Sequence, residues 1–361
     1  MENDKIRIAI THGDTNGIGY ETIFKIFSDP AMLELCTPII YGSPKIAAYH
    51  RKTLGLQTNF TIINNAEEAN DNRLNILTCF NDEVKIDIGT PTKASAKAAQ
   101  LALERALTDF EKELFDVLVT APVSEEDNQD GIDTSSTTKH IERATSHDGK
   151  SLTIHVNGGL RIASVTDDMP LGDALRELRK DLIVDKGTTF FNSLKRDFRL
   201  SSPRIALLQV NPQSGAEEED ILKPAIAEMH NEGVGIYGPY PADDFFSNML
   251  HSNFDGVLAM YYNQAMMPLR LLAEEGRLTL TAGLPIVHTS PGTTPSFDIA
   301  GKGIADESTL RNAIYLAIDT FRHRAEYDEP MANPLKKLYH EKRDESEKVR
   351  FAIPKKHEPQ S

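Results

Sequence analysis

The sequence has no tryptophan among its 361 residues and only two cysteines, Cys36 and Cys79. Neither cysteine belongs to a C-x-x-C pair or stands at a metal-binding spacing from a histidine, which argues against a disulfide scaffold and a zinc–thiolate centre. No apolar run reaches the roughly 20 residues that a membrane helix needs, and the charged start lacks the apolar segment of a signal peptide. We therefore expect a cytoplasmic protein with two idle thiols and no membrane partner.

Positive charge is also scarce. The chain has 39 lysines and arginines against 54 aspartates and glutamates, which gives a formal charge of -15 and a pI near 5.2. Nucleic acids and anionic membranes are bound by basic surfaces, so neither is expected as a partner. Hydrophobic residues make up 40% of the sequence, enough to build the cores of one large or two ordinary domains.

Short apolar runs alternate with helical patterns along the chain. The runs expected to form strands are 6–10, 38–41, 61–63, 116–119, 152–154, 161–165, 205–210 and 257–260. The segments expected to form helices are 21–26, 92–114, 172–179, 188–198 and 308–324. This alternation predicts an α/β fold with a mainly parallel sheet that is covered by helices on both faces.

The most informative segment runs from Phe254 to Arg270, where an apolar strand leads into a polar stretch before Pro268. Ligands of open parallel sheets gather beyond the carboxyl ends of the strands, so Tyr261 to Gln264 are expected to face a binding crevice as a polar elbow. This elbow contains tyrosines and amides but no acid, base or metal ligand that is active near neutral pH. Its position predicts a site, and its composition leaves the chemistry open.

A glycine-rich turn follows the first expected strand, from Thr11 to Gly19. Glycines between a strand and a helix let backbone N–H groups approach an anion. The spacing here is G-x-x-x-G-x-G and not the dinucleotide-binding G-x-G-x-x-G, so a purely structural tight turn is an equal alternative. Asp14 in this turn is expected to cap the following helix, with contact to a substrate as the alternative.

Several junctions, taken in order, resemble one family. The stretches that carry the resemblance are Ile10 to Glu21, Thr120 to Val123, Gly238 to Asp243, Ala259 to Tyr261, Gly283 to Pro285, Thr289 to Pro291 and Phe297 to Gly303. Together they are similar to the 4-hydroxythreonine-4-phosphate dehydrogenases, the NAD-dependent oxidoreductases of pyridoxal phosphate biosynthesis. The resemblance covers the chain from about Ile6 to Arg324.

The resemblance implies two α/β/α domains with a cleft between them, as in isocitrate and isopropylmalate dehydrogenases, and a homodimer. We expect residues 1–125 together with 305–327 to form the first domain and residues 126–304 to form the second, which would make the dimer contacts. Residues 328–361 are rich in Lys, Arg, Glu and Pro, which predicts a mobile tail with a possible short helix at 335–342. The hydrophilic run 125–131 is expected to be a domain crossing or surface loop.

The family reaction is an oxidative decarboxylation in which NAD accepts a hydride and a divalent metal polarises the oxygen. Three histidines hold that metal in the family. The positions that correspond to them here are Asp168, Gln213 and Tyr262. Asp168 remains as a weak ligand for a hard cation, whereas a phenol keeps its proton near neutral pH and is a poor ligand. We therefore expect no divalent metal at the family position.

The substrate positions also depart from the family pattern. The segment from Ser136 to Lys139 aligns with the family's G-H-T-E motif and lacks its histidine. Thr137 and Thr138 lie in this segment. Arg270 replaces the family's lysine, Thr279 its asparagine and His288 its arginine. We treat Thr137, Thr138, Arg270, Thr279 and His288 as the candidate substrate-binding residues.

These changes lie at polar positions, while the glycines, prolines and apolar residues that set the backbone are kept. The first hypothesis is a protein of the family fold that has lost most of the metal-assisted oxidation and keeps a ligand-binding or regulatory role. The alternative is an active NAD-dependent dehydrogenase, acting on the family substrate or on another phosphorylated or carboxylated hydroxy acid. Binding of NAD is possible under both, and the expected ligand is a small phosphorylated or carboxylated molecule.

Overall fold

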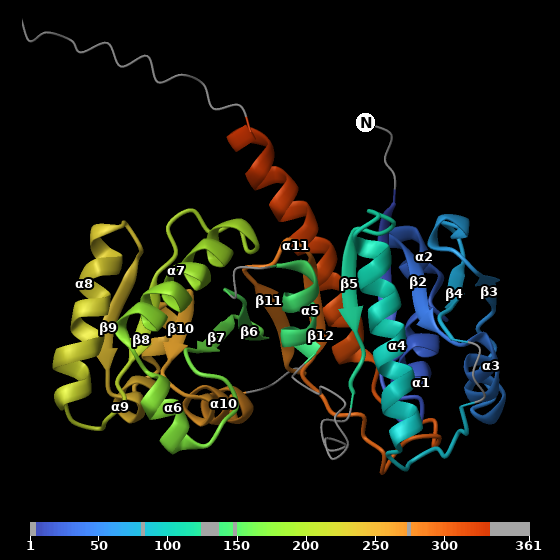
Figure 1. The fold of residues 1–361 in the computed structure, drawn as a ribbon, viewed down its shortest axis with the longest axis horizontal. Helices are drawn as coiled ribbons and strands as arrows, with labels where there is room; N and C mark the ends of the chain where they lie inside the picture. The colour runs from blue at the N-terminus through green and yellow to red at the C-terminus, as the bar shows by residue number, and fades with distance from the viewer. Residues whose placement is uncertain (1–4, 81–83, 124–136, 147–149, 273–275, 333–361) are drawn as a thin grey trace, which may run out of the picture.

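The computed structural model describes residues 5–80, 84–123, 137–146, 150–272 and 276–332. Its centre is a 12-stranded sheet with the order β3-β4-β2-β1-β5-β12-β11-β6-β7-β10-β8-β9 (Figure 1). The strands are β1 Ile6–Thr11, β2 Cys36–Gly42, β3 Phe60–Ile63, β4 Leu74–Thr78, β5 Val117–Thr120, β6 Leu152–Asn157, β7 Leu160–Ser164, β8 Ile205–Leu208, β9 Ile236–Tyr240, β10 Gly256–Ala259, β11 Leu278–Ala282 and β12 Val287–Pro291.

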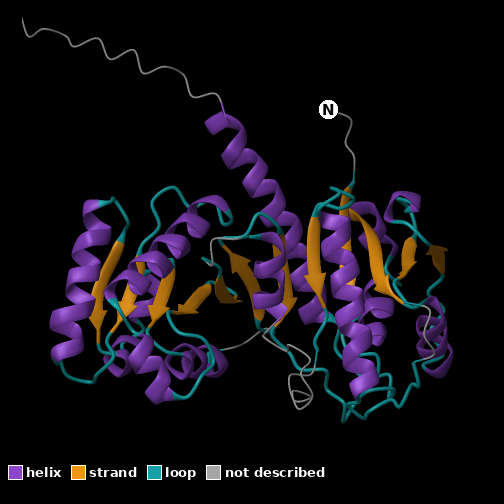
Figure 2. Cartoon of the chain, in the orientation of Figure 1, coloured by secondary structure: helices purple, strands orange, loops and turns teal. Residues whose placement is uncertain are grey.

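Helices lie on both sides of this sheet (Figure 2). They are α1 Gly19–Ile26, α2 Pro30–Leu35, α3 Pro44–Thr53, α4 Lys93–Phe110, α5 Thr137–Thr145, α6 Leu171–Glu177, α7 Lys180–Arg196, α8 Lys223–Asn231, α9 Ala242–Ser247, α10 Tyr262–Leu271 and α11 Ser308–Ala332. Short one-turn helices occur at Ala66–Glu68, Glu218–Leu222 and Leu250–Asn253. The predicted α/β fold with a mainly parallel sheet is confirmed.

Two parallel halves of the sheet meet through antiparallel strands. The six strands from β3 to β12 are parallel to their neighbours, and so are the four strands from β7 to β9. Strand β11 is antiparallel to β12 and to β6, and β6 is antiparallel to β7. One hydrogen-bonded sheet therefore passes through both halves of the chain. The domain boundaries expected from the sequence remain a prediction.

Each half of the sheet has an apolar core on both faces. In the first half, Ile8 and Val117 face α1 and α11, while Leu118 and Ile39 face α4 and α5. In the second half, one core contains residues of α7 and α8, and the other contains residues of α9 and α10. Helices α4, α5, α9 and α10 therefore cover one face of the sheet.

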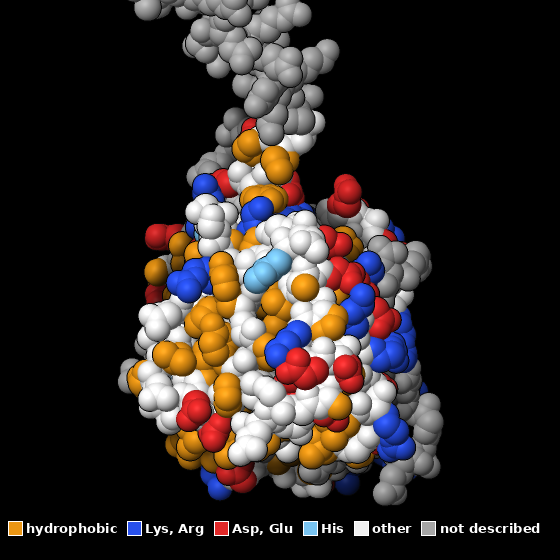
Figure 3. All heavy atoms as spheres, turned by 90° about the vertical axis from the view of Figure 1, so that its left-hand side faces the viewer, with side chains coloured by type: hydrophobic (Ala, Val, Ile, Leu, Met, Phe, Trp, Pro, Cys, Tyr) orange, Lys and Arg blue, Asp and Glu red, His pale blue; other side chains and the backbone are white. Residues whose placement is uncertain are grey.

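Strand β9 is the last strand of the second half, and its outer side belongs to the face shown in Figure 3. Hydrophobic side chains form a stripe on this face, with charged groups of both signs beside it (Figure 3). Tyr237 of β9 is 38% exposed and contacts the guanidinium group of Arg204, whose carbon lies 5.4 Å from the ring centroid.

Within the described residues, no helix has both the length and the apolar content to cross a membrane.

The structure corrects three predicted elements. The prediction of a polar elbow between two apolar segments is wrong, because Tyr262 to Gln264 form the first turn of α10 directly after β10. Helix α7 begins at Lys180, eight residues before the predicted start, and it contains Gly187 because a side chain there would meet Met229 of α8. Helix α11 continues to Ala332, past the predicted end at Arg324.

The longer α11 reaches into the segment expected to be a mobile tail. Asp328, the first residue of that segment, pairs with Arg196 of α7 through an Nε to Oδ1 distance of 2.9 Å. The rest of the expected tail from 333 onward, including the short helix at 335–342, lies outside the described residues. So do the hydrophilic run 125–131 and Ser136.

Candidate functional site

Asp168, Tyr262 and Gln213 follow the carboxyl ends of three neighbouring strands. Strand β10 lies between β7 and β8 and is parallel to both. Asp168 lies in the connection after β7, Tyr262 begins the helix after β10, and Gln213 lies in the connection after β8. Because parallel neighbours end at the same edge, the sheet brings these distant segments to one edge.

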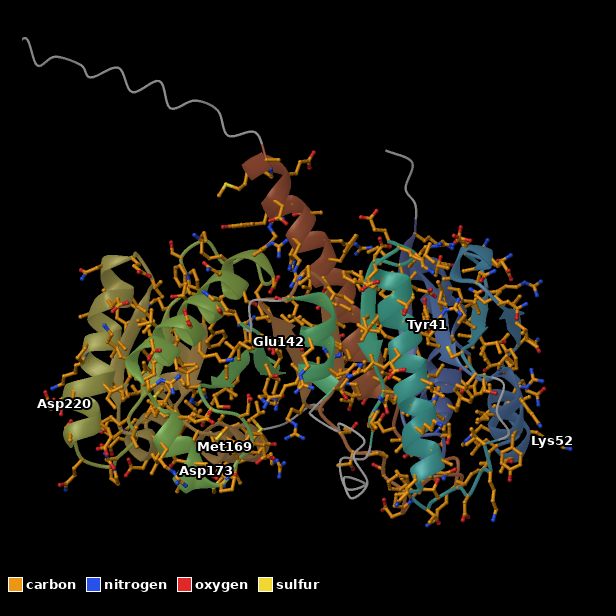
Figure 4. All side chains as sticks on the ribbon, viewed as in Figure 1. Tyr41, Lys52, Glu142, Met169, Asp173 and Asp220 are labelled. Atoms are coloured by element: carbon orange, nitrogen blue, oxygen red, sulfur yellow. The ribbon has the colours of Figure 1, made fainter. Side chains whose placement is uncertain are left out.

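The connection after β7 is fastened to the end of β10. The Thr166 hydroxyl donates to the carbonyl oxygen of Met260 at 3.1 Å, and the Val165 amide donates to that of Ala259 at 2.9 Å. Asp168 is exposed beyond this point, next in the chain to Met169, which Figure 4 labels near α6. The preceding residue, Asp167, forms an ion pair with Lys139 of α5, with 3.0 Å between Oδ2 and Nζ.

Gln264 ties the ends of β10 and β8 together. Its Oε1 accepts from the Met260 amide at 2.8 Å, and its Nε2 donates to the Gln209 carbonyl at 2.6 Å. Tyr261, the N-cap of α10, makes no side-chain cap hydrogen bond, and Gln264 satisfies a backbone donor just before the helix. Both polar atoms of the Gln264 side chain therefore bond the protein backbone, which gives this residue a structural role at the site.

The loop that carries Gln213 closes on a buried carboxylate. Glu218 accepts from the amides of Val210 at 3.0 Å, Asn211 at 2.9 Å and Gly215 at 2.7 Å. Burial raises the pKa of Glu218, but these hydrogen bonds outweigh burial and hold the pKa below its usual value. Gln213 itself is exposed at the outer side of this loop.

The three residues do not fit a catalytic transition metal. They offer one carboxylate, one amide and one phenol, whereas zinc, iron and nickel favour imidazole and thiolate ligands. Among the described residues, no three histidine, cysteine, aspartate or glutamate side chains are grouped so that they could hold a metal ion. Asp168 alone is a weak oxygen ligand for a hard cation.

A polar row crosses the sheet on the face covered by α5 and α10. His155 of β6 lies opposite Thr279 of β11, which in turn lies opposite Ser290 of β12. The hydroxyls of Thr279 and Ser290 are hydrogen-bonded at 2.7 Å. Arg277 precedes Thr279 by two residues and therefore points to the same face. Its Nε donates to the Gly292 carbonyl at 3.0 Å.

Arg270 of α10 and Arg277 lie close enough to repel each other. Burial lowers the pKa of Arg277, the charge of Arg270 lowers it further, and Tyr262 opposes the shift. The pKa of His155 falls to about 4, first because of burial and then because of Arg277 and Arg270. The structure thus brings the predicted residues Arg270, Thr279 and Tyr262 together with two residues that the sequence did not single out.

Sequence reasoning missed Arg277 and His155 because neither stands in a recognisable motif. The only available signal was alternation. Residues 277, 279 and 281 share one face of a strand, so a basic residue two positions before Thr279 has to share its surroundings. No strand was predicted at Leu278–Ala282, however, and His155 reaches the same place only through the antiparallel pairing of β6 with β11.

His288 differs from its prediction as a substrate-binding residue. It is 2% exposed, its Nε2 lies 2.9 Å from Thr120 Oγ1, and its Nδ1 lies 2.8 Å from Thr281 Oγ1. Burial lowers its pKa to about 4, so the imidazole is neutral. Both ring nitrogens are used inside the sheet, and this geometry gives His288 a structural role in place of the predicted ligand contact.

Thr137 and Thr138 begin α5, whose Ile141 packs with Leu284 and Ile286 over β11 and β12. Figure 1 shows α5 in front of these strands, and Figure 4 labels its Glu142. The ion pair between Lys139 and Asp167 brings the start of α5 to the connection after β7. The two threonines therefore lie at the same edge as Asp168.

The glycine-rich turn after β1 is buried, and its backbone is fastened to neighbouring loops, although the His12 ring nitrogens and the Thr15 hydroxyl have no hydrogen-bond partner among the described residues. The Asp14 amide donates to the Pro122 carbonyl at 3.0 Å, and the Ile18 amide donates to the Pro295 carbonyl at 3.1 Å. A Cβ at Gly19 would lie 2.0 Å from the His12 carbonyl oxygen, which explains why glycine is required there. This packing favours the structural tight turn over an anion cradle.

Asp14 does not cap α1, which was the expected role. Its Oδ1 accepts from the Asn16 amide at 2.8 Å, and its Oδ2 accepts from the Ser95 hydroxyl of α4 at 3.0 Å. The N-cap of α1 is Ile18, which has no side-chain cap. Asp14 therefore joins the glycine-rich turn after β1 to α4.

Comparison with known proteins shows the family of the chain. The family model described as "Pyridoxal phosphate biosynthetic protein PdxA" matches residues 34–317. A 4-hydroxythreonine-4-phosphate dehydrogenase of Bacteroides thetaiotaomicron is 47% identical over 97% of this chain and 98% of its own length. A D-threonate 4-phosphate dehydrogenase of Cupriavidus necator is 31% identical over 88% of this chain and 98% of its own length.

Among solved structures, a putative 4-hydroxythreonine-4-phosphate dehydrogenase of Salmonella typhimurium superposes with a TM-score of 0.74 at 26% identity. The match covers 88% of this chain and 100% of that one. The sequence match extends over nearly the whole length of the relatives and includes all three strand ends of the candidate site. The chain belongs to the family of the pyridoxal phosphate biosynthetic protein PdxA.

Proposed function

We propose that this chain binds a small phosphorylated hydroxy acid at the carboxyl edge of β7, β10 and β8, and that its metal-assisted oxidation is weak or lost. A ligand-binding or regulatory role would then remain. The observation that carries the proposal is the donor set of Asp168, Gln213 and Tyr262. It supplies no imidazole and one carboxylate at the position where the family resemblance implies three histidines.

The energetic argument concerns charge that develops on the substrate oxygen. An oxidation that removes a hydride from a hydroxyl carbon leaves negative charge on oxygen unless a cation or a strong donor stabilises it. Losing one preorganised stabilising group raises a barrier by about 3–4 kcal/mol. Tyr262 and Gln213 carry no positive charge and cannot replace a divalent cation at this position.

The positive charge of Arg270 and Arg277 supports the binding part of the proposal. Neither Arg270 nor Arg277 forms an ion pair with a carboxylate within the described part of the chain. Two arginines that lie together without an acidic partner favour an anionic ligand. The names of the relatives describe dehydrogenases of 4-phosphates, which supports a small phosphorylated acid as the first candidate ligand.

A second candidate function is favoured by the Bacteroides relative. Its identity of 47% over almost the whole chain supports an active NAD-dependent dehydrogenase, on 4-phosphooxythreonine or on another phosphorylated or carboxylated hydroxy acid. Binding of NAD belongs to both candidates. We also propose the cytoplasmic homodimer that the family resemblance implies, with residues 126–304 supplying its contacts.

The deciding experiment measures NADH formation from 4-phosphooxythreonine with protein purified without a histidine tag. The Bacteroides enzyme serves as the positive control, and zinc, manganese and magnesium are each tested with and without a chelator. Elemental analysis of the same protein reports bound metal. We expect binding of the phosphorylated acid in a thermal-shift assay with little or no turnover. A stoichiometric transition metal together with turnover would overturn the proposal in favour of the second candidate.

A further inference from the structure

We propose that Arg277 and His155 bind the phosphate group of the ligand, and that His155 takes up a proton when a phosphate dianion enters. The inference rests on the proposed function, since it assigns the anionic end of the same ligand. Neither residue was expected from the family resemblance, which implied an arginine at the position of His288.

The first argument is the surroundings of Arg277. Its guanidinium group is fixed by the Gly292 carbonyl, to which Nε donates at 3.0 Å, and by a contact of 3.8 Å between Nη1 and Met266 Sδ. Arg277 is half-buried, and none of its N–H groups meets a carboxylate within the described residues. An arginine that is fixed in place with donors to spare is preorganised for an anion with several oxygens.

The second argument is the state of His155. Its Nδ1 is buried and has no hydrogen-bond partner among the described residues. Neutral imidazole has one nitrogen that can donate, whereas the protonated ring donates from both nitrogens. A buried nitrogen without a partner is costly, and an anion beside a protonated ring would satisfy it.

The charged groups that act on His155 within the described part of the chain, Arg277 and Arg270, both favour the neutral ring. Arg277 precedes β11, and Arg270 comes from α10, while the residues opposite His155 in the sheet, Thr279 and Ile162, carry no charge. The neighbours of His155 in β6, Ile154 and Val156, face the opposite core. A bound dianion would reverse the local field and draw a proton onto the ring.

The third argument separates phosphate from carboxylate. Arg270, Arg277 and protonated His155 together carry three positive charges. A carboxylate offers one charge and two oxygens, while a phosphate monoester offers close to two charges and three terminal oxygens. The phosphate matches the number of donors better, and the neighbouring hydroxyls of Thr279 and Ser290 add neutral hydrogen-bonding groups. The structure therefore favours a phosphate monoester as the ligand class.

The test is calorimetric titration with 4-phosphooxythreonine, 4-hydroxythreonine and inorganic phosphate at pH 6, 7 and 8. Repeating each titration in two buffers of different ionisation enthalpy measures the protons taken up. For the wild type we expect the phosphorylated acid to bind at least tenfold more tightly than its unphosphorylated form, with proton uptake that is largest at pH 7 to 8.

Four variants separate the roles. Arg277→Ala should weaken the phosphorylated ligand at least tenfold and leave 4-hydroxythreonine within twofold, while Arg277→Lys should recover part of the loss. His155→Gln should abolish the ring's proton uptake. Arg322→Ala removes an exposed arginine from α11 on the other face of the sheet and should change nothing. Circular dichroism confirms that each variant is folded.

The outcomes distinguish the two proposals. If the wild type binds none of the three probes, the proposed function fails. If it binds the phosphorylated acid but folded Arg277→Ala and His155→Gln bind it equally well, the proposed function stands and the assignment of Arg277 and His155 is overturned. Wild-type binding without proton uptake at any pH would likewise overturn the role given to His155.

Discussion

The Nε2 atom of His288 lies 2.9 Å from the hydroxyl oxygen of Thr120, deep inside the sheet. Thr120 is the last residue of β5, and His288 belongs to β12, so this hydrogen bond fastens two neighbouring strands at one edge. The other ring nitrogen bonds Thr281 of β11. One imidazole therefore joins three consecutive strands where the two parallel halves of the sheet meet.

Replacing His288 should reduce stability and leave ligand affinity unchanged. His288→Leu keeps much of the side-chain volume but leaves two buried hydroxyls unpaired, which should cost about 2–4 kcal/mol in the free energy of unfolding. Urea denaturation measures the loss. In a double-mutant cycle with Thr281→Val, we expect a coupling of about 1 kcal/mol. If His288→Leu is stable but binds the ligand more weakly, the result would support the predicted contact between His288 and the substrate.

Acidification should destabilise the fold between pH 6.5 and 4 because His12, His155 and His288 are neutral in the folded state. Burial is the first cause in each case and lowers all three pKa values to about 4. The unfolded chain binds these protons near pH 6.5 and the folded chain only near pH 4. Stability is therefore present above 6.5 and falls by roughly 1.4 kcal/mol per pH unit for each histidine.

Urea denaturation at pH 7.5, 6.5 and 5.5 tests this slope while staying above the range in which most carboxylates titrate. His12→Phe is the informative variant. His12 is fully buried, and its ring stacks on Tyr20 with 5.1 Å between centroids. The variant keeps a ring and removes one proton site, so its pH dependence should be shallower than that of the wild type, while His155, His288 and His50, whose pKa burial also lowers, still contribute. An unchanged slope would assign the acid sensitivity to other groups.

Glu218 should determine the order of the loop that carries Gln213. Glu218→Gln replaces an ionised acceptor of three backbone amides with a neutral amide, which should cost about 2–3 kcal/mol. Hydrogen exchange of the Val210, Asn211 and Gly215 amides should rise by at least tenfold. Because hydrogen bonds hold the pKa of Glu218 below its usual value, its contribution is present above pH 4.5 and is lost as the pH falls further.

Glu217→Gln is the matched control. Glu217 is exposed, and among the described residues the bond it accepts comes from the side chain of Asn211, at 3.0 Å. Its replacement removes the same charge from the adjacent position and should change stability by less than about 0.5 kcal/mol. Equal effects of the two substitutions would mean that the net charge of this segment, and not the bonds to the loop, governs its order.

The sequence predicted those strands that are short apolar runs ending in a turn, as in Ile6–Thr11 and Val117–Thr120. It missed β4, β9, β11 and β12. Leu278–Ala282 alternates with threonines, Ile236–Tyr240 contains Gly238 and Pro239, and polar residues interrupt the apolar ones in Leu74–Thr78 and Val287–Pro291. The start of α7 was hidden by Gly187, which is usually unfavourable inside a helix but here allows close contact with α8.

In the candidate site, too, some residues were predicted from the sequence and others were not. Asp168, Gln213 and Tyr262 were assigned through the motifs of the family resemblance, and in the structure their segments follow neighbouring parallel strands. Arg277 and His155 meet through the pairing of β6 with β11, which is fixed by the tertiary fold. The burial of His288 was equally invisible, because only the structure supplies Thr120 and Thr281 as its partners.

Restoring three histidines provides the strongest test of the correspondence among the strand ends. Asp168→His, Gln213→His and Tyr262→His together would place three imidazoles after β7, β8 and β10. Asp168 and Gln213 are exposed and Tyr262 is half-buried, so the substitutions should cost little stability. Imidazole is a preferred ligand of zinc and nickel. We expect the triple variant to retain one equivalent of zinc after gel filtration, measured by elemental analysis.

The three single variants are the controls for this test. Each adds one imidazole, and one ligand does not hold zinc through gel filtration, so we expect less than about 0.1 equivalent per chain. The folded triple variant should also show a zinc-dependent rise in melting temperature that a chelator reverses. If the triple variant folds but retains no more zinc than the single variants, then these three positions do not converge on a metal site, and the argument for lost metal-assisted oxidation loses its basis.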